Sequence, residues 1–350
     1  MNIAVILPKL VSEAPVLVAK DLIEQIHDKV SLIDIYYFDG ENEVGFQCNC
    51  YKVSFFEPFD FDKYDIIHTH TLKPDLYIWK HRRKIKNAKC ISTIHNYVKA
   101  FRSIFNLVTA FCVGKIWLLA LRHQDAIVVL SENMKSEFSV NLDEKKMRVI
   151  YNGRRLSEDL LNVKFNNEDD KKIKVLRADF KIIGVSARLN KIKGFSQLIK
   201  ALPNLKDYAL IFIGDGEEKE NLITLASELG VIDRCLFLGY RKNGYLYLPY
   251  FDIFAMTSFS EGFPLGLLEA GKFKLPVVCS DLPIFKELFD ESEVVFFELN
   301  NIKSLEKSIT LLYENRDFFS LNIFNKVSQN YTVENMAKNY LSLYNELLDL

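Results

Sequence analysis

The sequence has few cysteines, almost no net charge and no internal repeat or low-complexity segment. Its six cysteines are unevenly spaced over 350 residues, so they predict no disulfide framework and fit a reducing cytosol. Cys48 and Cys50 could form half of a zinc site, but no second pair stands at zinc spacing, and two thiols in or beside a short strand are expected instead. A net charge of −1 argues against a dedicated nucleic-acid-binding protein, which would show a basic excess.

The distribution of apolar residues predicts neither a secretory signal peptide nor a membrane-spanning helix. Residues 2–8 are apolar but short and lack a basic flank, so they predict a buried first strand and a cytoplasmic protein. Only residues 104–121 approach spanning length. The polar or small positions in this stretch are Asn106, Thr109, Gly114 and Lys115. A buried or cleft-lining helix is therefore expected, with contact to the bilayer surface as the alternative.

Apolar strands alternate with amphipathic helices in both halves of the chain, as in βαβ units. In the first half, strands are expected at residues 3–7, 31–38, 64–70, 90–95, 126–130 and 147–151. In the second half, they are expected at 181–186, 209–213, 235–238, 252–257, 276–280 and 294–298. Residues 162–174 are polar and lack an apolar period, so they are the predicted linker. The length and this break predict two doubly wound α/β domains.

The most informative stretch is residues 258–270, a turn between an apolar strand and a helical pattern. The first turn of a helix exposes backbone N–H groups that bind anions, and Gly266 would allow a phosphate to approach the backbone closely. Glu261 and Glu269 bracket this turn. A carboxylate one or two turns into the helix could accept the two hydroxyls of a ribose. The stretch therefore predicts a site for a nucleoside diphosphate attached to another group.

The same stretch resembles a family signature. It reads Glu261-Gly262-Phe263-Pro264 and then Leu268-Glu269-Ala270. This pattern is similar to that of retaining glycosyltransferases of family 4, which have the GT-B fold. The resemblance implies that Glu261 contacts the hydroxyls of the donor sugar, that Glu269 binds the ribose, and that the diphosphate lies on the amides of Leu265, Gly266 and Leu267. The alternative is an ordinary strand-to-helix turn with solvated carboxylates.

A second motif follows the strand expected at 181–186. Arg188 offers a planar fork and Lys193 a point charge, a combination that suits a diphosphate. The segment resembles the family's Gly-Arg-Leu-x-x-x-Lys-Gly motif, with Ala187 in place of the first glycine. By resemblance, Arg188 and Lys193 would neutralise the departing nucleoside diphosphate. The alternative is a pair of surface cations in a loop.

Weaker signals follow two further strands. Gly214 lies in a glycine-rich turn that is common in this family and elsewhere. Tyr240 and Arg241 occupy the place where relatives wrap the backbone around the nucleotide base. Tyr240 could stack on the base or be a surface aromatic residue.

Three histidines in the first half of the chain are candidate site residues. His95 ends a Thr-x-His pattern whose imidazole contacts the donor sugar in relatives, and a capped or core histidine is the alternative. His68 and His70 share one face of their strand and could form a metal triad with His95. The family carries this pattern without a metal, so no metal is expected. Asp60 and Asp62 form an Asp-x-Asp of the type used by metal-dependent GT-A enzymes, but they lie far from the strong motifs and are rejected as a metal site.

Two features concern the acceptor side. Residues 80–86, followed by Lys89, Lys99 and Arg102, form the only concentrated charge. This cluster is either a solvated helix face or a patch that faces anionic lipid. The loop at residues 8–15 lacks the Gly-Gly that many relatives have there, which leaves the geometry of the acceptor open.

The resemblance covers nearly the whole chain and implies a GT-B enzyme. The expected parts are an acceptor-side domain at 1–165, a donor-binding domain at 175–330 and a terminal helix at 331–350 that crosses back. The expected activity is retaining transfer of a hexose from a nucleotide sugar, with UDP favoured, to a hydroxyl of a glycan or lipid-linked saccharide. No cofactor, metal or nucleic acid is expected, and the setting would be surface polysaccharide synthesis, with peripheral contact with the cytoplasmic face of the inner membrane. The alternatives are a GT-B epimerase or phosphorylase, and a non-catalytic nucleotide-sugar-binding module.

Overall fold

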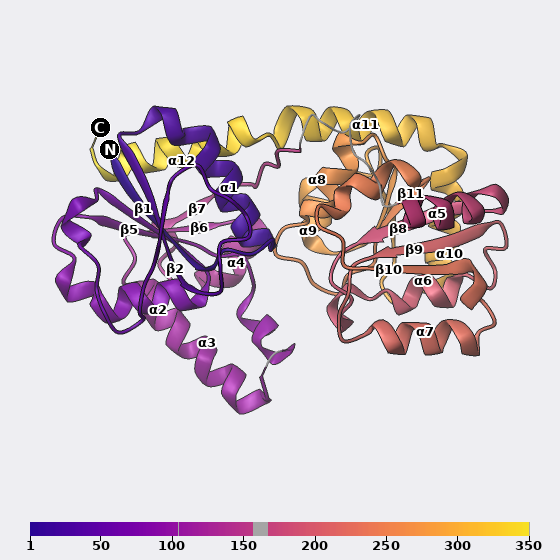
Figure 1. Ribbon diagram of the computed structural model, residues 1–350, viewed down its shortest axis with the longest axis horizontal. Helices are drawn as coiled ribbons and strands as arrows, with labels where there is room; N and C mark the ends of the chain where they lie inside the picture. Colours follow the sequence, from indigo (N-terminus) through magenta and orange to yellow (C-terminus); the bar gives the residue numbers. More distant parts are fainter. Residues whose placement is uncertain (104, 157–166, 350) are drawn as a thin grey trace. The chain divides into compact units, whose positions relative to one another are not determined.

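Strands and helices alternate along both halves of the chain (Figure 1). The structure is a computed structural model that describes residues 1–103, 105–156 and 167–349. These residues form two compact units, the first comprising the described residues of 1–155 with 331–349 and the second comprising 156 with 167–330. Each unit has its own sheet and its own buried core.

The first unit contains a parallel seven-stranded sheet in the order β3-β2-β1-β4-β5-β6-β7. The strands are β1 (Asn2–Lys9), β2 (Leu32–Asp39), β3 (Asn49–Lys52), β4 (Ile66–His70), β5 (Lys89–Thr93), β6 (Ala126–Val129) and β7 (Met147–Val149). The strand order reverses direction between β1 and β4. In doubly wound sheets, ligands bind beyond the carboxyl ends of the strands at such a switch point.

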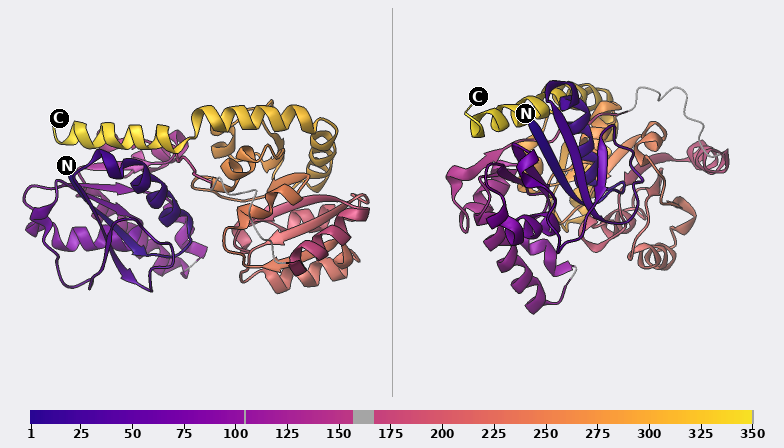
Figure 2. Two further views of the ribbon diagram at one scale, coloured as in Figure 1. Left: turned by 45° about the horizontal axis from the view of Figure 1, so that its top comes forward. Right: turned by 60° about the vertical axis from the view of Figure 1, so that its left-hand side comes forward.

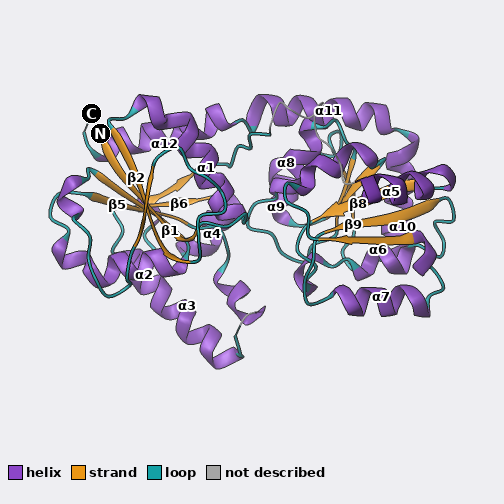
Figure 3. Ribbon diagram, in the orientation of Figure 1, coloured by secondary structure: helices purple, strands orange, loops and turns teal. Residues whose placement is uncertain are grey.

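Helices cover both faces of this sheet (Figure 3). They are α1 (Ala14–Ile26), α2 (Leu72–His81), α3 (Leu107–Arg122), α4 (Glu132–Ser139) and α12 (Val333–Leu347). The terminal helix α12 lies in this unit and packs against α1 (Figure 2). Ser131 accepts a hydrogen bond from the Met134 amide at 2.9 Å and thereby caps the N-terminus of α4.

The second unit contains a parallel six-stranded sheet in the order β10-β9-β8-β11-β12-β13. The strands are β8 (Lys181–Ser186), β9 (Tyr208–Ile213), β10 (Cys235–Gly239), β11 (Ile253–Met256), β12 (Val277–Ser280) and β13 (Val295–Phe297). Here the order reverses between β8 and β11, so the loops after these two strands meet at the switch point.

The helices of the second unit also lie on both sides of its sheet. They are α5 (Asn167–Asp179), α6 (Ser196–Ala201), α7 (Lys219–Glu228), α8 (Leu265–Lys272), α9 (Pro283–Leu288), α10 (Ile302–Glu314) and α11 (Arg316–Asn330). Helix α10 packs on α6, and α11 packs on α8. The side chains of β8, β9 and α10 form one continuous apolar core under the α6 face.

One sequence expectation is wrong in this unit. The linker predicted at 162–174 lies outside the described residues up to 166, and its remaining part forms the first half of α5. Ile173 is the fully buried apolar side chain of this part of α5. Because a single apolar residue does not repeat, the sequence shows no apolar period here. Its helical turns are instead supported by the Lys172–Glu168 and Lys174–Asp170 ion pairs at i,i+4 spacing.

The stretch at 104–121 was expected to form a buried or cleft-lining helix, and α3 is buried on one face while part of its other face lines a groove. Trp117 and Leu118 are buried, as predicted. The opposite face exposes apolar side chains, namely Leu107, Val108, Phe111, Ile116 and Leu119. Among the described helices, none is both long and apolar enough to cross a bilayer. The exposed face of α3 is therefore a surface feature that needs an explanation.

Candidate functional site

The strongest sequence motifs meet at the switch point of the second unit. Strands β8 and β11 are paired neighbours, with Ile253 opposite Ile183. Arg188 and Lys193 follow β8, while Glu261 follows β11. β9 pairs with one edge of β8, and β10 lies beyond β9. The other edge of β8 is therefore available to pair with β11, which brings the two loops together.

Hydrogen bonds join the two loops directly. Thr257 Oγ1 donates to the carbonyl oxygen of Lys193 at 2.9 Å, and the Phe259 amide donates to the carbonyl oxygen of Ile192 at 2.7 Å. Gly194 has a φ of +63°, and a Cβ at this residue would lie 2.3 Å from the Thr257 carbonyl oxygen. Only glycine fits this conformation and this close approach. The loop carrying Lys193 is therefore held against the loop carrying Glu261.

A partly buried ion pair lies at this junction. Lys193 Nζ is 2.7 Å from Glu261 Oε1, and Ser258 Oγ donates to the same oxygen at 2.5 Å. The Glu261 side chain is 9% exposed and that of Lys193 is 23% exposed. A second oxygen of Glu261 and two further N–H donors of Lys193 remain for other groups. The sequence motifs predicted both charged residues, whereas Ser258 begins the 258–270 stretch and had no predicted role of its own.

Arg188 lies on the outer side of the same loop. Its side chain is 71% exposed and its Nη2 is 3.2 Å from Glu217 Oε2, an exposed pair that contributes little to stability. The guanidinium can therefore turn toward an anion at small cost. Gly214 supports the base of this loop, since a Cβ there would lie 1.9 Å from the Ala187 carbonyl oxygen.

Helix α8 begins directly after the Glu261 turn. The Leu265 amide donates to the Phe263 carbonyl oxygen at 3.1 Å, and the Leu267 amide donates to that of Pro264 at 3.0 Å. Two of the three amides assigned to a diphosphate thus already have partners within the turn. A Cβ on Gly266 would meet only the Phe254 ring, at 3.3 Å. Glu269 is half-buried on this helix.

Tyr240 and Arg241 follow β10 and differ in their surroundings. Tyr240 is 61% exposed. Arg241 Nε and Nη2 donate to the two carboxylate oxygens of Asp169 at 2.7 and 2.9 Å. The hydrogen bond from Arg241 is the largest influence that holds the pKa of Asp169 below its usual value. Arg241 therefore fastens α5 to the strand end, a role that the sequence did not indicate because Asp169 lies 72 residues away.

The histidines form a separate cluster in the first unit. His70 ends β4, and His95 lies two residues beyond β5. His70 Nδ1 is 2.9 Å from His95 Nε2. His68 is hydrogen-bonded through Nε2 to Thr93 Oγ1 at 2.7 Å and through Nδ1 to the Tyr344 hydroxyl at 2.8 Å. The terminal helix α12 thus helps to fix the carboxyl ends of β4 and β5.

Burial keeps these imidazoles neutral. Desolvation lowers the pKa of His68 and of His95 to about 3. It also lowers the pKa of His70 well below its usual value. No group of three potential metal ligands is found in the part of the chain that the structure describes. One hydrogen bond joins His70 to His95, whereas His68 is hydrogen-bonded to Thr93 and Tyr344.

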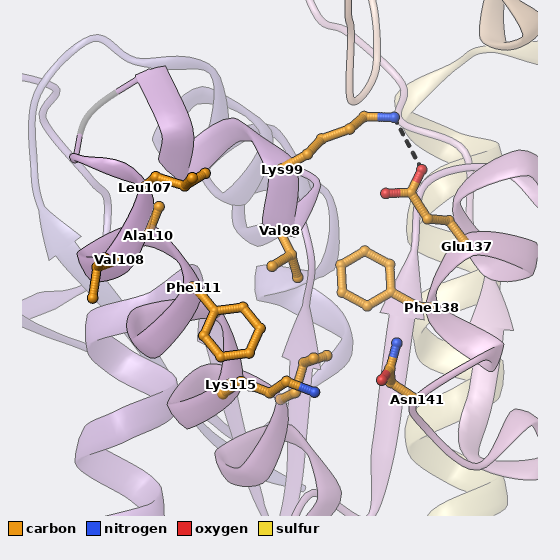
Figure 4. Close-up of a pocket in the computed structure, with 12 residues that line it drawn as sticks. Val98, Lys99, Leu107, Val108, Ala110, Phe111, Lys115, Glu137, Phe138 and Asn141 are labelled. Carbon is orange, nitrogen blue, oxygen red and sulfur yellow. Dashed lines mark hydrogen bonds and ion pairs between the residues drawn. The ribbon is translucent and has the colours of Figure 1, made fainter.

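An apolar groove of about 630 Å³ lies beside α3 (Figure 4). Phe111 of α3 and Phe138 of α4 face it from opposite sides of Val98, which belongs to a short 3-10 helix at Val98–Ser103. Lys99 at its rim is 3.0 Å from Glu137. Gly114 lets the two segments approach, because a Cβ there would lie 2.5 Å from Val98 Cγ1.

Most of the basic cluster at 80–86 points outward. Lys80, Arg83, Lys84 and Lys86 are exposed. Arg82 is the exception, since its Nε donates to the His123 carbonyl oxygen at 3.2 Å and its Nη2 pairs with Asp125 at 3.3 Å. These cations belong to α2 and the turn after it, and α2 packs against α3. The charged patch and the exposed apolar face of α3 therefore belong to neighbouring helices of one unit.

Comparison with known proteins gives consistent matches. The family described as Glycosyl transferases group 1 matches residues 166–330, and Glycosyltransferase Family 4 matches residues 54–158. An O-antigen biosynthesis glycosyltransferase of Escherichia coli, WclY, is 30% identical over 357 residues, which cover 99% of each chain. An E. coli UDP-Gal:alpha-D-GlcNAc-diphosphoundecaprenol alpha-1,3-galactosyltransferase is 24% identical over 322 residues, covering 85% of this chain and 79% of that protein.

The structural comparison agrees. The chain is similar to Anabaena HepE in complex with UDP-glucose, with a TM-score of 0.80 and 18% identity over 99% of this chain and 100% of the other. This likeness, together with the two parallel sheets, confirms the expected GT-B fold.

Proposed function

The chain belongs to the glycosyl transferases group 1 of family 4, and from this premise we propose that it transfers a hexose from a UDP-sugar to a hydroxyl of a lipid-linked saccharide, with retention of the anomeric configuration. The observation that carries the proposal is the Lys193–Glu261–Ser258 cluster at the switch point of the second unit. It places a cation beside a carboxylate, an arrangement that would suit a diphosphate joined to a sugar.

The residues of the second unit divide between the parts of the donor. Lys193 and the exposed guanidinium of Arg188 would neutralise the diphosphate. Glu269 would accept the ribose hydroxyls, and the second oxygen of Glu261 would accept a hydroxyl of the sugar. On binding, the diphosphate would compete with Glu261 for Lys193. Charge that develops on the departing diphosphate strengthens that contact, so the cation contributes most in the transition state.

In the proposed reaction the bond from the anomeric carbon to the diphosphate oxygen breaks, and a bond to the acceptor oxygen forms on the same face of the sugar. The proton of the acceptor hydroxyl passes to an oxygen of the departing diphosphate. The protein then contributes positioning and charge stabilisation, and no base of its own.

The acceptor class rests on the relatives. The name of the 24% identical galactosyltransferase contains both UDP-Gal and a diphosphoundecaprenol-linked sugar, and the 30% identical relative is named for O-antigen biosynthesis. These names support a lipid-linked saccharide and a role in surface polysaccharide assembly.

The donor site is tested by calorimetric titration and hydrolysis with a panel of UDP- and GDP-sugars, with and without EDTA. We expect one UDP-sugar to bind in either condition. Binding should weaken at least tenfold in Glu269→Ala, while Glu228→Ala, on the exposed end of α7, should bind as the wild type does. Equal affinity of the Glu269→Ala and wild-type proteins would refute the assignment. NMR of the first product formed with an accepted saccharide then gives its anomeric configuration, and inversion would refute retention.

We also propose that the exposed face of α3 and the cations of α2 contact the cytoplasmic leaflet of the inner membrane. Residues 72–122 contain eleven lysines or arginines and one acidic residue, Asp75. Asp75 is buried, and its carboxylate accepts hydrogen bonds from Thr69 and Trp117, so it does not offset the outward charge. Such a patch would repel a second copy of itself, whereas an anionic membrane attracts both the cations and the apolar groove.

Co-sedimentation with phosphatidylcholine vesicles, with or without phosphatidylglycerol, tests this contact. Each cation near an anionic surface contributes about 1 kcal/mol, so reversal of Arg83 and Lys84 to Glu should weaken binding at least tenfold. Phe111→Ser should weaken it at low and high salt alike, because its contribution is apolar. The matched control reverses Lys303 and Lys307, which are exposed on α10. Equal effects of the two reversals would refute the proposal.

A further inference from the structure

His70 and His95 share a hydrogen bond that the topology of the first unit dictates. In the sheet, His70 stands opposite Thr93, and the chain continues from Thr93 to His95 beyond the end of β5. Their ring nitrogens, His70 Nδ1 and His95 Nε2, are 2.9 Å apart, and the ring planes differ by only 26°. The lone pair and the N–H can therefore both lie close to the ring planes.

Two neutral rings that share one contact have two possible arrangements of hydrogen. Both rings are buried, with exposures of 1% for His70 and 8% for His95, and their lowered pKa values mean that each carries a single N–H. Either His70 Nδ1–H donates to His95, or His95 Nε2–H donates to His70. The first arrangement leaves the hydrogen of His95 on Nδ1, and the second leaves Nδ1 of His95 as an acceptor.

The far nitrogen of His70 distinguishes the two arrangements. Among the described residues, His70 Nε2 is buried and has no hydrogen-bond partner. In the second arrangement this atom would carry a buried N–H without an acceptor. Orphaned buried N–H donors are rarer than under-satisfied acceptors. The first arrangement, in which His70 donates through Nδ1, is therefore favoured.

We propose that His70 is a positioning residue that holds His95 in the Nδ1–H form, so that His95 offers a hydrogen-bond donor, and not a base, to a hydroxyl of the donor sugar. This inference rests on the proposed function and deepens it. His95 Nδ1 makes no hydrogen bond within the described residues, so it is the nitrogen left for a ligand. A donor at this position agrees with a reaction in which the protein removes no proton from the acceptor.

The surroundings of His70 keep its ring in place. The ring lies against His68, with centroids 4.4 Å apart. His68 is in turn hydrogen-bonded to Thr93 and Tyr344, and Thr93 Oγ1 lies 2.9 Å from the Tyr340 hydroxyl. Two tyrosines of α12 thus support the strand ends from which His70 and His95 extend. A ring fixed in this way can impose one tautomer on its neighbour.

The tautomer can be read without any variant of His70. Long-range 15N–1H NMR spectra of protein labelled at its six histidines separate Nδ1–H from Nε2–H imidazoles, and the His95 signals are assigned by their loss in His95→Gln. In the unliganded wild type we expect His95 as Nδ1–H and His70 as Nδ1–H. Finding His95 as Nε2–H would overturn the proposal.

Three substitutions of His70 then test the consequence for catalysis. Asparagine can place an amide N–H where Nδ1 was, so His70→Asn should keep the Nδ1–H form of His95 and a kcat within about threefold of the wild type. His70→Gln has the same amide displaced by one bond, and His70→Leu has no donor. Both should change the tautomer and lower kcat roughly tenfold to a hundredfold, with a smaller change in the KM of the donor.

Different outcomes would contradict the role of His70, the sugar contact of His95 and the proposed function. Unchanged kcat and unchanged tautomer in His70→Leu would overturn the positioning role. Wild-type transfer by His95→Gln would overturn the contact with the donor sugar. Failure of every nucleotide sugar to bind, with the tautomer as expected, would count against the proposed function instead.

Discussion

The buried histidines should make the first unit sensitive to mild acid. His68 is 0% exposed, and burial lowers its pKa to about 3 from an unfolded value of 6.5. Between these values the unfolded chain binds a proton that the folded chain does not, so stability is complete above pH 6.5 and falls as the pH is lowered. At pH 5, the linkage relation gives a loss of roughly 2 kcal/mol for one such histidine.

The carboxyl of Asp75 changes the pH dependence of stability in the opposite direction, so the contribution of His68 must be isolated with a variant. Burial raises the pKa of Asp75 to about 6, so the folded state binds a proton there between pH 6 and 4 and gains stability on acidification. We therefore compare the wild type with His68→Gln, which cannot titrate at this position. The loss of unfolding free energy between pH 7 and pH 5 should be roughly 2 kcal/mol larger in the wild type.

The chain offers a convenient probe for this measurement. Its two tryptophans are Trp79 and Trp117, which both lie in the first unit, so urea unfolding followed by tryptophan fluorescence reports on that unit. Ionic strength is held constant, and free energies are obtained by linear extrapolation. His27→Gln, on the surface of the same unit, is the matched control and should retain the wild-type loss. A difference between wild type and His68→Gln below about 0.5 kcal/mol would refute the reasoning.

Three further predictions concern the second unit. Lys193→Met and Glu261→Gln each leave a partly buried charge without its partner, so a double-mutant cycle in urea unfolding should give a coupling of roughly 1–3 kcal/mol; additive losses would contradict the pair. Gly266→Ala would place a Cβ 3.3 Å from the buried Phe254 ring, so the first turn of α8 must shift and UDP binding should weaken tenfold or more; an unchanged Kd in calorimetry would exclude a role of this turn in holding the diphosphate. Arg241→Lys keeps the charge but loses the two-point contact with Asp169, so unfolding followed by circular dichroism should show a loss of about 1–2 kcal/mol, and a stability equal to that of the wild type would show that the contact is not needed to hold α5.

Much of the fold could be predicted because its strands are apolar and evenly separated. β8 was predicted with its observed bounds, 181–186. Strand β3 was expected only as a short strand at or beside Cys48 and Cys50, and it carries little signal because it is four residues long and mostly exposed at the sheet edge. Helix α11 was missed altogether. It buries only Phe319, Ile323 and Val327, a stripe of one residue per turn, and it depends on close packing with α8 that no local pattern reveals.

The candidate site was predictable as a set of residues but not as an arrangement. Motif spacing indicated Lys193 and Glu261 separately, each with a different part of the donor. Their mutual contact spans 68 residues and exists because β8 and β11 are adjacent, which is a property of strand order. The same holds for Arg241, since its partner Asp169 comes from a helix whose sequence resembled a linker. Long-range polar contacts of this kind leave no periodic trace in the sequence.

Charge distribution along the chain shows why a composition average can mislead. The net charge of −1 argues against nucleic acid as a partner, yet the segment 72–122 has a large basic excess and the remainder is correspondingly acidic. A membrane responds to the local patch, because charges farther away than a Debye length are screened. The acidic remainder would meanwhile be repelled by an anionic leaflet. This asymmetry would orient the protein with α2 and α3 toward the lipid, so that vesicle binding should depend on the cations of this segment and not on the total charge.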